Sequence, residues 1–259
     1  TEELGRDRRV YGTFHRLCPQ GKEKDFFRLD AARPESLEAI LKETEPREII
    51  SCLRGPYEGQ LELHQRAARY LRGREEGRLF FCSTANVFDG AADRPHTEAD
   101  PPCPASDYGA FKAACEALLI RSLGERAVIL RLPMLFGSGS PRIVALRDSI
   151  RKGEPVDRMP GVQVNLNTDR HLARQLRMIL ESGQKGIFHP GTGETVPYSE
   201  LIEALWQRLG KPAVRFEDSP PEEPPYWLAA VPARPDLPAG FAISVKQVIN
   251  ASVEPERGT

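Results

Sequence analysis

One stretch constrains the fold of this chain most strongly, a buried strand followed by a helix that carries a tyrosine and a lysine one turn apart. The apolar run Leu79–Cys82 predicts a short buried strand, with Ser83 and Thr84 at its end. The residues after Tyr108 are rich in Ala, Leu, Glu and Lys, which favours a helix. On a helix, Tyr108 and Lys112 are i and i+4, so their side chains project from one face.

These residue types suit the transfer of a proton to a carbonyl oxygen. A phenol has a pKa of about 10, and an ammonium group beside it lowers that pKa. A strand-end hydroxyl such as that of Thr84 would add a second hydrogen bond to the same oxygen. The alternative is that Thr84, Tyr108 and Lys112 are only a strand-end hydroxyl, a loop tyrosine and a solvated lysine.

Three segments of this region carry a resemblance to a known family: STANVFDG from residue 83, PHTEADPP from residue 95 and YGAFK from residue 108. Together they resemble the extended short-chain dehydrogenase/reductase superfamily, and within it the family of dTDP-4-dehydrorhamnose reductase. Sugar-nucleotide reductases and a non-catalytic regulatory subunit of methionine adenosyltransferase are among the relatives of that family. The resemblance implies that Thr84, Tyr108 and Lys112 are the catalytic residues.

The same resemblance implies an α/β fold, consistent with the alternation of short apolar strands and amphipathic helices along the chain. The implied fold is an NAD(P)-binding Rossmann domain, which is a parallel sheet with helices on both faces, joined to a small C-terminal substrate lobe. The Rossmann domain is expected at residues 1–135 and again at about 163–190, and the lobe at 136–162 and 191–259.

The family's first strand and its glycine-rich turn do not occur in residues 1–259. In the family that turn holds the dinucleotide pyrophosphate at a helix N-terminus. We expect that the start of the protein precedes Thr1, because a sheet without this strand would leave two neighbouring edges unpaired.

Two positions bear on the cofactor. Arg16, with His15, follows a predicted strand at residues 9–14, where the family selects its cofactor, and a cation there suits the 2′-phosphate of NADP. Asp30 follows a second strand and resembles an aspartate that lies by the adenine, or else it caps the next helix. A solvated arginine is the alternative for Arg16, and NAD is the alternative cofactor. The resemblance also assigns Ser83, Tyr108 and Lys112 to the cofactor.

Ala85 and Asn86 stand where the family pattern has Asp and Tyr, beside the substrate. Arg142 is the candidate for binding a nucleotide-sugar pyrophosphate, because such anions need cations, although a charged helix face is the alternative. The segment 162–167, VQVNLN, departs completely from the family's D-Q-x-x-x-P-T motif. These departures place the sugar specificity, or the reaction itself, in question.

Composition narrows the range of partners. The 36 basic and 37 acidic residues give a net charge of −1, so no long-range attraction to nucleic acid or to an anionic membrane is expected. No apolar run is long enough to span a membrane. Five cysteines without a CxxC pair predict reduced, mostly buried thiols in a cytoplasmic protein, and no metal-ligand spacing occurs.

These observations predict an NADP-dependent reductase of a keto-sugar nucleotide, a homodimer being one arrangement, with hydride from NADPH and a proton from Tyr108. Two alternatives stay open. One is a nucleotide- or sugar-nucleotide-binding regulatory protein without turnover, and the other is an epimerase or dehydratase on the same scaffold. Turnover separates the first alternative from the reductase, and net hydride consumption separates the second.

Overall fold

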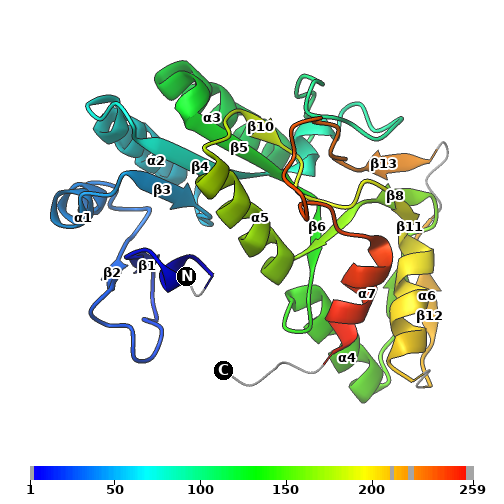
Figure 1. Ribbon diagram of the computed structural model, residues 1–259. Helices are drawn as coiled ribbons and strands as arrows, with labels where there is room; N and C mark the ends of the chain where they lie inside the picture. The colour runs from blue at the N-terminus through cyan, green and yellow to red at the C-terminus, as the bar shows by residue number, and fades with distance from the viewer. Residues whose placement is uncertain (1–2, 211–212, 221–224, 255–259) are drawn as a thin grey trace. The chain divides into compact units, whose positions relative to one another are not determined.

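The computed structural model describes residues 3–210, 213–220 and 225–254 (Figure 1). The contacts between residues divide the chain into two compact units. Unit 1 comprises residues 1–83, 110–130 and 183–187, and unit 2 comprises residues 84–109, 131–182 and 188–259. The expected division into a cofactor-binding domain and a substrate lobe, with other boundaries, stays a prediction about function. Of the C-terminal tail at 254–259, all but Glu254 lies outside the described residues.

The strands of unit 1 form two sheets. A four-stranded sheet has the order β10-β5-β4-β3, and β1 pairs with β2 in parallel as a separate pair. β3 and β4 are also parallel, with Ser51 opposite Phe81. β4 and β5 are almost entirely buried, which explains their continuous apolar sequences. The strand bounds are β1 Gly12–Phe14, β2 Phe26–Arg28, β3 Glu48–Ser51, β4 Arg78–Thr84, β5 Ala127–Leu132 and β10 Ile187–Phe188.

The break between these two sheets falls where the sequence predicts an absent strand. Among the described residues, β1 pairs only with β2, and β3 pairs only with β4. One edge of β1 and one edge of β3 therefore carry no strand within the described part of the chain. A further parallel strand is the element that would satisfy the backbone groups of both edges.

Three helices and the strands β4 and β5 share the core of unit 1. They are α1 Ser36–Thr44, α2 Tyr57–Arg72 and α3 Asp107–Leu123. The first three residues of α3 belong to unit 2. Leu41, Leu63, Phe81, Leu119 and Ile129 are buried together in this core.

Unit 2 is built from short strands and four helices. β8 lies between β11, which is antiparallel to it, and β13, which is parallel; β6 pairs with β9 and β7 with β12. The strands are β6 Met134–Phe136, β7 Val156–Arg158, β8 Val162–Val164, β9 Leu166–Thr168, β11 Val196–Pro197, β12 Phe216–Asp218 and β13 Tyr226–Leu228. The helices are α4 Pro141–Lys152, α5 Asp169–Ser182, α6 Tyr198–Arg208 and α7 Val245–Val253.

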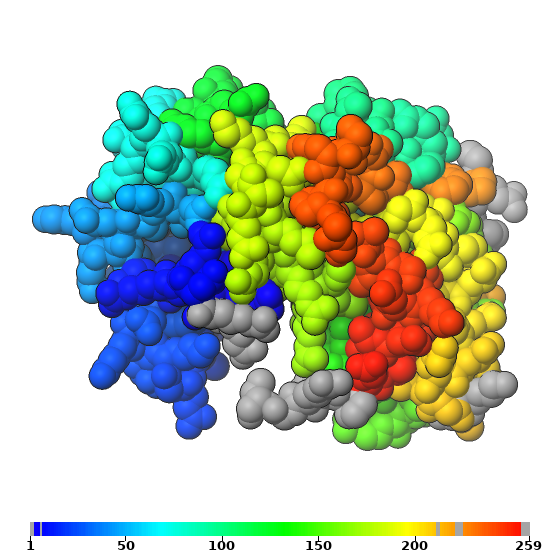
Figure 2. Space-filling view, viewed as in Figure 1, coloured from blue at the N-terminus to red at the C-terminus, as the bar shows by residue number. Residues whose placement is uncertain are grey.

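α6 and α7 contact each other along the surface of unit 2 (Figure 2). Their apolar faces share a second core that includes Phe136, Ile143, Leu166, Leu205 and Val248. Residues 212–238 contain eight prolines, which disfavour a helix or a central strand. In its described part this segment forms only β12 and the edge strand β13. The Trp227 backbone amide donates a hydrogen bond to the Ala92 carbonyl at 2.8 Å, and this bond holds β13 in place.

Three single-turn 3-10 helices complete the described elements, at Leu4–Arg6, Ala85–Phe88 and Gly124–Arg126. No helix among the described residues is long and apolar enough to cross a membrane.

All five cysteines are free thiols, but the expectation that most are buried is wrong. Only Cys115 is buried, whereas Cys52 and Cys103 are exposed and Cys18 and Cys82 are intermediate. Cys52 and Cys103 lie outside the helices and strands of the described residues.

Candidate functional site

The candidate residues of unit 1 gather where β4 ends. Ser83 is almost fully buried, and its hydroxyl donates a hydrogen bond to Glu116 on α3. Lys112, one turn before Glu116, is 5% exposed, and its Nζ donates to the Cys82 carbonyl oxygen at 2.8 Å. The Lys112 ammonium also lies over the Phe81 ring, 4.6 Å from its centre. Lys112 is therefore held in place by the strand and is not the solvated lysine of the alternative reading.

Burial determines the electrostatics of Lys112. Desolvation lowers the pKa of Lys112, and nearby thiols and the Glu116 carboxylate oppose that shift. Beyond Lys112 lies His64, whose ring accepts or donates a hydrogen bond with the Ser51 hydroxyl at 2.7 Å. Burial and, secondly, the Lys112 ammonium lower the pKa of His64 to about 4. His64 is thus a buried neutral side chain on the inner face of α2.

The candidate residues of unit 2 begin with Thr84. Its hydroxyl accepts a hydrogen bond from the Asn86 amide at 3.2 Å and donates one to Asn86 Oδ1 at 3.0 Å. Thr84 thereby caps the 3-10 helix Ala85–Phe88, in which Ala85 is buried. Asn86, which stands where the family pattern has a tyrosine, therefore engages the hydroxyl that the sequence predicts as a hydrogen-bond donor to substrate.

Asp89 is a residue of this region that the sequence reasoning did not assign. Its carboxylate accepts hydrogen bonds from the Ser106 hydroxyl and from the backbone amides of Ala105 and Ser106. Burial raises the pKa of Asp89, but these hydrogen bonds outweigh burial and hold that pKa below its ordinary value. Ser106 Oγ in turn accepts from the Gly109 amide at 3.1 Å, so Asp89 positions the first turn of α3.

Gly109 explains why glycine follows the tyrosine in the YGAFK segment. A Cβ atom at residue 109 would lie 2.2 Å from the Asn86 carbonyl oxygen, closer than any real contact. Only glycine lets the start of α3 pack on the 3-10 helix. Tyr108, the residue before it, is 42% exposed. Tyr108 and Lys112 are both on α3, one turn apart, as predicted.

The predicted adenine-side residues lie together at the ends of β1 and β2. Asp30 accepts a hydrogen bond from the Ala32 amide at 2.9 Å, and this bond is the first cause that lowers its pKa. His15 Nε2 and Arg33 Nε lie 3.7 and 3.6 Å from its carboxylate oxygens. Arg16 is exposed in the loop after β1. Asp30 thus forms a local turn with Ala32 and does not cap α1, whose N-cap residue is Glu35, whereas its role toward adenine stays a prediction.

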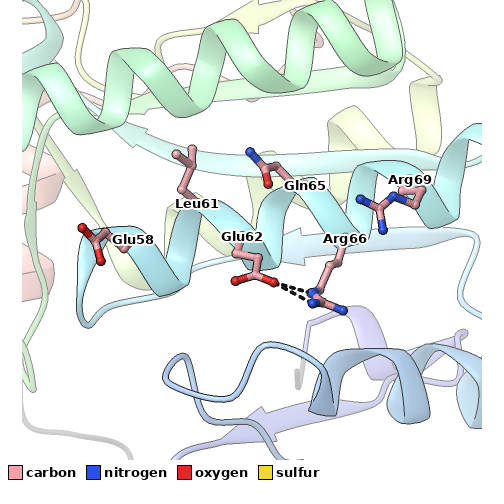
Figure 3. Close-up of a pocket in the computed structure, with 6 residues that line it drawn as sticks. All are labelled: Glu58, Leu61, Glu62, Gln65, Arg66 and Arg69. Atoms are coloured by element: carbon pink, nitrogen blue, oxygen red, sulfur yellow. Dashed lines mark hydrogen bonds and ion pairs between the residues drawn. The ribbon is translucent and has the colours of Figure 1, made fainter.

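Two open hollows lie on unit 1. One is lined by Arg28, Asp30, Arg33, Glu35 and Ser36 and therefore contains a predicted cofactor residue. The other follows the outer face of α2, where Glu62 and Arg66 form an ion pair (Figure 3), and it contains none of the predicted residues. Its lining residues are Glu58, Leu61, Glu62, Gln65, Arg66 and Arg69.

On α4 the three arginines differ in their partners. Arg147 donates to the Ser138 carbonyl at 3.1 Å, and Arg151 pairs with Asp148 at 2.9 Å, so both have structural roles. Arg142 is exposed, and its guanidinium lies beside the Tyr198 hydroxyl, where it opposes the burial that raises the pKa of Tyr198. The role of Arg142 toward an anion stays a prediction.

The segment 162–167 owes its departure from the family motif to buried amides. Asn165 Nδ2 donates to the carbonyls of Thr192 and Ala230 at 3.2 and 2.7 Å. Asn167 Nδ2 donates to Gln175 Oε1 at 2.7 Å and to the Pro190 carbonyl at 2.6 Å. We call these residues, with Gln175 and Thr192, the amide cluster.

Residues 61–227 match the family described as the RmlD substrate binding domain. The chain belongs to this family. It is 26% identical over 210 residues to a dTDP-4-keto-6-deoxy-D-glucose reductase of Streptomyces niveus, covering 74% of this chain and 71% of that protein. The chain spans about half or less of the length of the other curated relatives that it matches.

Solved structures confirm the Rossmann fold. The structure of a dTDP-4-dehydrorhamnose reductase from Clostridium acetobutylicum is similar with a TM-score of 0.72 and 18% identity, over 93% of this chain and 97% of that one. The enzyme WbmH of Bordetella bronchiseptica, in complex with NAD+, gives a TM-score of 0.77 at 18% identity, over 96% and 90%. The family match and the curated reductases confirm the resemblance to the extended short-chain dehydrogenase/reductases, and the expectation of an oxidoreductase agrees with the name of the Streptomyces niveus relative.

Proposed function

We propose that this chain is an NADP-dependent reductase of a keto-sugar nucleotide in which Tyr108 gives the proton to the carbonyl oxygen. The observation that carries the proposal is the Tyr-Gly-x-x-Lys run on α3. Its glycine is required for close packing against Asn86, and its lysine is buried with a lowered pKa. The reductase named among the relatives supports the choice of reaction.

A reduced nicotinamide dinucleotide, when bound, supplies the hydride for such a reduction. Lys112 suits a ribose hydroxyl because it is a buried ammonium fixed by the Cys82 carbonyl. The hollow at Asp30 contains Arg28 and Arg33, and with the exposed Arg16 nearby in sequence these cations suit a 2′-phosphate. Residues 1–259 contain no glycine-rich turn of the family's kind. The contacts proposed for Lys112 and for the three arginines therefore concern only the ribose and adenine ends of the dinucleotide.

In the proposed reaction, the Tyr108 hydroxyl donates its proton to the substrate oxygen while Thr84 hydrogen-bonds the same oxygen. Lys112 favours the phenolate that Tyr108 becomes. Because the Thr84 hydroxyl donates to Asn86 Oδ1, it must rotate away from Asn86 to serve a substrate. Ser83 is a proposed cofactor contact, and the hydrogen bond that its hydroxyl donates to Glu116 fixes its side chain.

The proposed substrate contacts are Ala85 and Asn86 next to Thr84, and Arg142 for an anionic diphosphate. The division into a cofactor-binding domain at 1–135 and 163–190 and a substrate lobe at 136–162 and 191–259 belongs to the same proposal. A homodimer is part of it too, and sedimentation of the purified chain tests that arrangement.

The decisive experiment compares Tyr108→Phe with wild type. The phenyl ring keeps the shape of the side chain but has no proton to give, so kcat should fall by about 10²–10⁴ while cofactor affinity stays within about twofold. Turnover is followed by the absorbance of NADPH with a dTDP-4-keto-6-deoxy sugar as substrate. Tyr57→Phe is the matched control, because Tyr57 is 43% exposed and stacks on Phe111. Unchanged turnover in Tyr108→Phe would refute the proposed proton donor.

A second function is favoured by one observation, the hydrogen bond that engages the Thr84 hydroxyl with Asn86. It is the binding of a nucleotide or sugar nucleotide without turnover. A thermal shift separates the two proposals when it is combined with the turnover assay. Ligand at a hundredfold excess over Kd adds about 2.7 kcal/mol to stability. A shift with NADPH but no consumption of it with any keto sugar nucleotide would favour the binding protein.

A further inference from the structure

Two cysteines of unit 1 lie side by side where β3 and β4 end. Ser51 pairs with Phe81 across the two strands, so Cys52 and Cys82 are the next residues along. Their sulfur atoms are 3.3 Å apart. Neighbouring strands are about 4.8 Å apart, within the range of about 4.4–6.8 Å that a disulfide spans between Cα atoms. A bond between these sulfurs therefore requires a side-chain movement and no rearrangement of the sheet.

The two thiols differ in their protonation. The hydrogen bond shared with Cys82 and the nearby Lys112 ammonium outweigh desolvation and lower the pKa of Cys52 to about 7. The same hydrogen bond and burial raise the pKa of Cys82 well above that of an ordinary thiol. Cys52 is thus the member of the pair that loses its proton more readily, and Cys82 keeps its proton.

Exposure follows the same asymmetry. Cys52 is exposed, whereas Cys82 is intermediate. Of the other cysteines, Cys115 is buried with its pKa raised to about 11, mainly by burial. Cys103 is exposed and lies in unit 2. The sulfur–sulfur hydrogen bond found among the described residues is the one between Cys52 and Cys82. Cys52 and Cys82 are the two thiols that geometry, charge and access bring together.

We propose that Cys52 and Cys82 form an oxidisable dithiol, a modification site that reacts with low-molecular-weight disulfides. The Cys52 thiolate attacks one sulfur of the disulfide, whose sulfur–sulfur bond breaks and releases one thiolate. The Cys82 thiol then gives its proton to that released thiolate and attacks Cys52 Sγ, which expels the second thiolate. Two protein thiols become one protein disulfide, and the small disulfide takes up both electrons and becomes two thiols.

This site is separate from the proposed reduction in its chemistry but close to it in space. The Cys82 carbonyl holds Lys112 Nζ at 2.8 Å, and both thiols act electrostatically on the Lys112 ammonium. Oxidation removes the negative charge of Cys52 from beside Lys112. The thiol reaction needs neither cofactor nor sugar nucleotide, so its test stands or fails independently of the proposed reductase activity.

The test is incubation of the reduced full chain with oxidised glutathione at pH 7, followed by intact mass and peptide mapping. Wild type should lose two of its five free thiols and retain no glutathionyl group, with one disulfide between Cys52 and Cys82. Cys82→Ser should instead keep one glutathionyl group on Cys52, because no second thiol displaces it. Cys103→Ser, which removes an exposed cysteine of unit 2, should behave as wild type.

A second measurement is the rate at which iodoacetamide alkylates Cys52 as a function of pH. In wild type the rate should reach half its maximum near pH 7, and in Cys82→Ala, which removes the hydrogen bond to Cys52, this midpoint should move upward. At pH 7 a thiol with a pKa of about 7 should react roughly threefold faster than one with a pKa of about 8.5, after allowing for its lower intrinsic nucleophilicity. A stable glutathionyl group on Cys52 in wild type, a disulfide between other cysteines, or an unshifted midpoint would each overturn the proposal.

Discussion

Two buried polar regions of this protein have opposite chemical characters. In unit 1, the Lys112 cluster (Ser51, His64, Ser83, Lys112 and Glu116) contains groups that gain and lose protons. In unit 2, the amide cluster contains neutral side chains that hold the backbone of neighbouring segments. Buried titratable groups cost folding free energy and are suited to chemistry, whereas satisfied amides stabilise loops. Substitutions should therefore affect activity in the first cluster and stability in the second.

The largest effect is expected from Lys112→Met. Turnover of the proposed reductase should fall by about a hundredfold or more, because the ammonium beside the ribose and the phenol is lost. The unfolding free energy should be unchanged or higher, since burial lowers the pKa of Lys112 and the charged form is disfavoured in the fold. Urea unfolding and NADPH consumption measure the two quantities. Lys152→Met, on α4 with a side chain 56% exposed, is the control. A strongly destabilised Lys112→Met would make the Lys112 cluster structural.

The opposite result is expected from Asn165→Ala. Removal of the amide leaves the Thr192 and Ala230 carbonyls and the Ala230 N–H without this partner. The unfolding free energy should fall by about 2–4 kcal/mol. Binding of NADPH at saturating concentration should persist at temperatures below the transition. Gln65→Ala, an exposed amide on α2, should change stability by less than about 0.5 kcal/mol. Equal effects of the two substitutions would remove the stabilising role of the amide cluster.

The pH dependence of stability tests the titratable character of the Lys112 cluster. His64 has a folded pKa lowered to about 4 from 6.5, so below pH 6.5 the unfolded chain binds a proton that the folded chain does not. The unfolding free energy contributed by His64 is therefore complete above pH 6.5 and falls as the pH drops toward 4, by about 3 kcal/mol in all.

His64→Leu should remove this part of the pH dependence, measured by urea unfolding at several pH values between 7 and about 4. His189 in unit 2 should keep its own share, because burial and then the Arg131 guanidinium lower its pKa to about 3. An identical acid profile in His64→Leu and wild type would show that His64 takes up its proton in the folded state.

The smallest effect is expected from Asn86→Ala. This substitution frees the Thr84 hydroxyl from Asn86 Oδ1, while the backbone amide at residue 86 still donates to Thr84 Oγ1. Turnover should change by less than about tenfold, because the freed Thr84 hydroxyl opposes the loss of the proposed Asn86 contact with substrate, and the unfolding free energy should fall by about 1 kcal/mol or less. A rise in turnover of more than about tenfold would contradict the role of Asn86 as a substrate contact.

Residue order alone determined the strands and helices with strong periodicity. The strand predicted at Leu79–Cys82 lies within β4, and the helix after Tyr108 was predicted to carry Tyr108 and Lys112 one turn apart. Such elements follow from short-range patterns of apolar residues and helix formers. The break in the parallel sheet was also predictable, because it follows from an absent strand between two neighbours that are present.

Tertiary structure decided which polar residues are buried and what they contact. Glu116 could have been noticed, since it lies one turn beyond Lys112, but its hydrogen bond to Ser83 depends on how α3 packs on β4. The need for Gly109 and the pairing of Cys52 with Cys82 likewise require residues that are far apart in the chain. A sequence shows local periodicity, but hydrogen bonds, desolvation and pKa shifts arise only when distant segments meet in the fold.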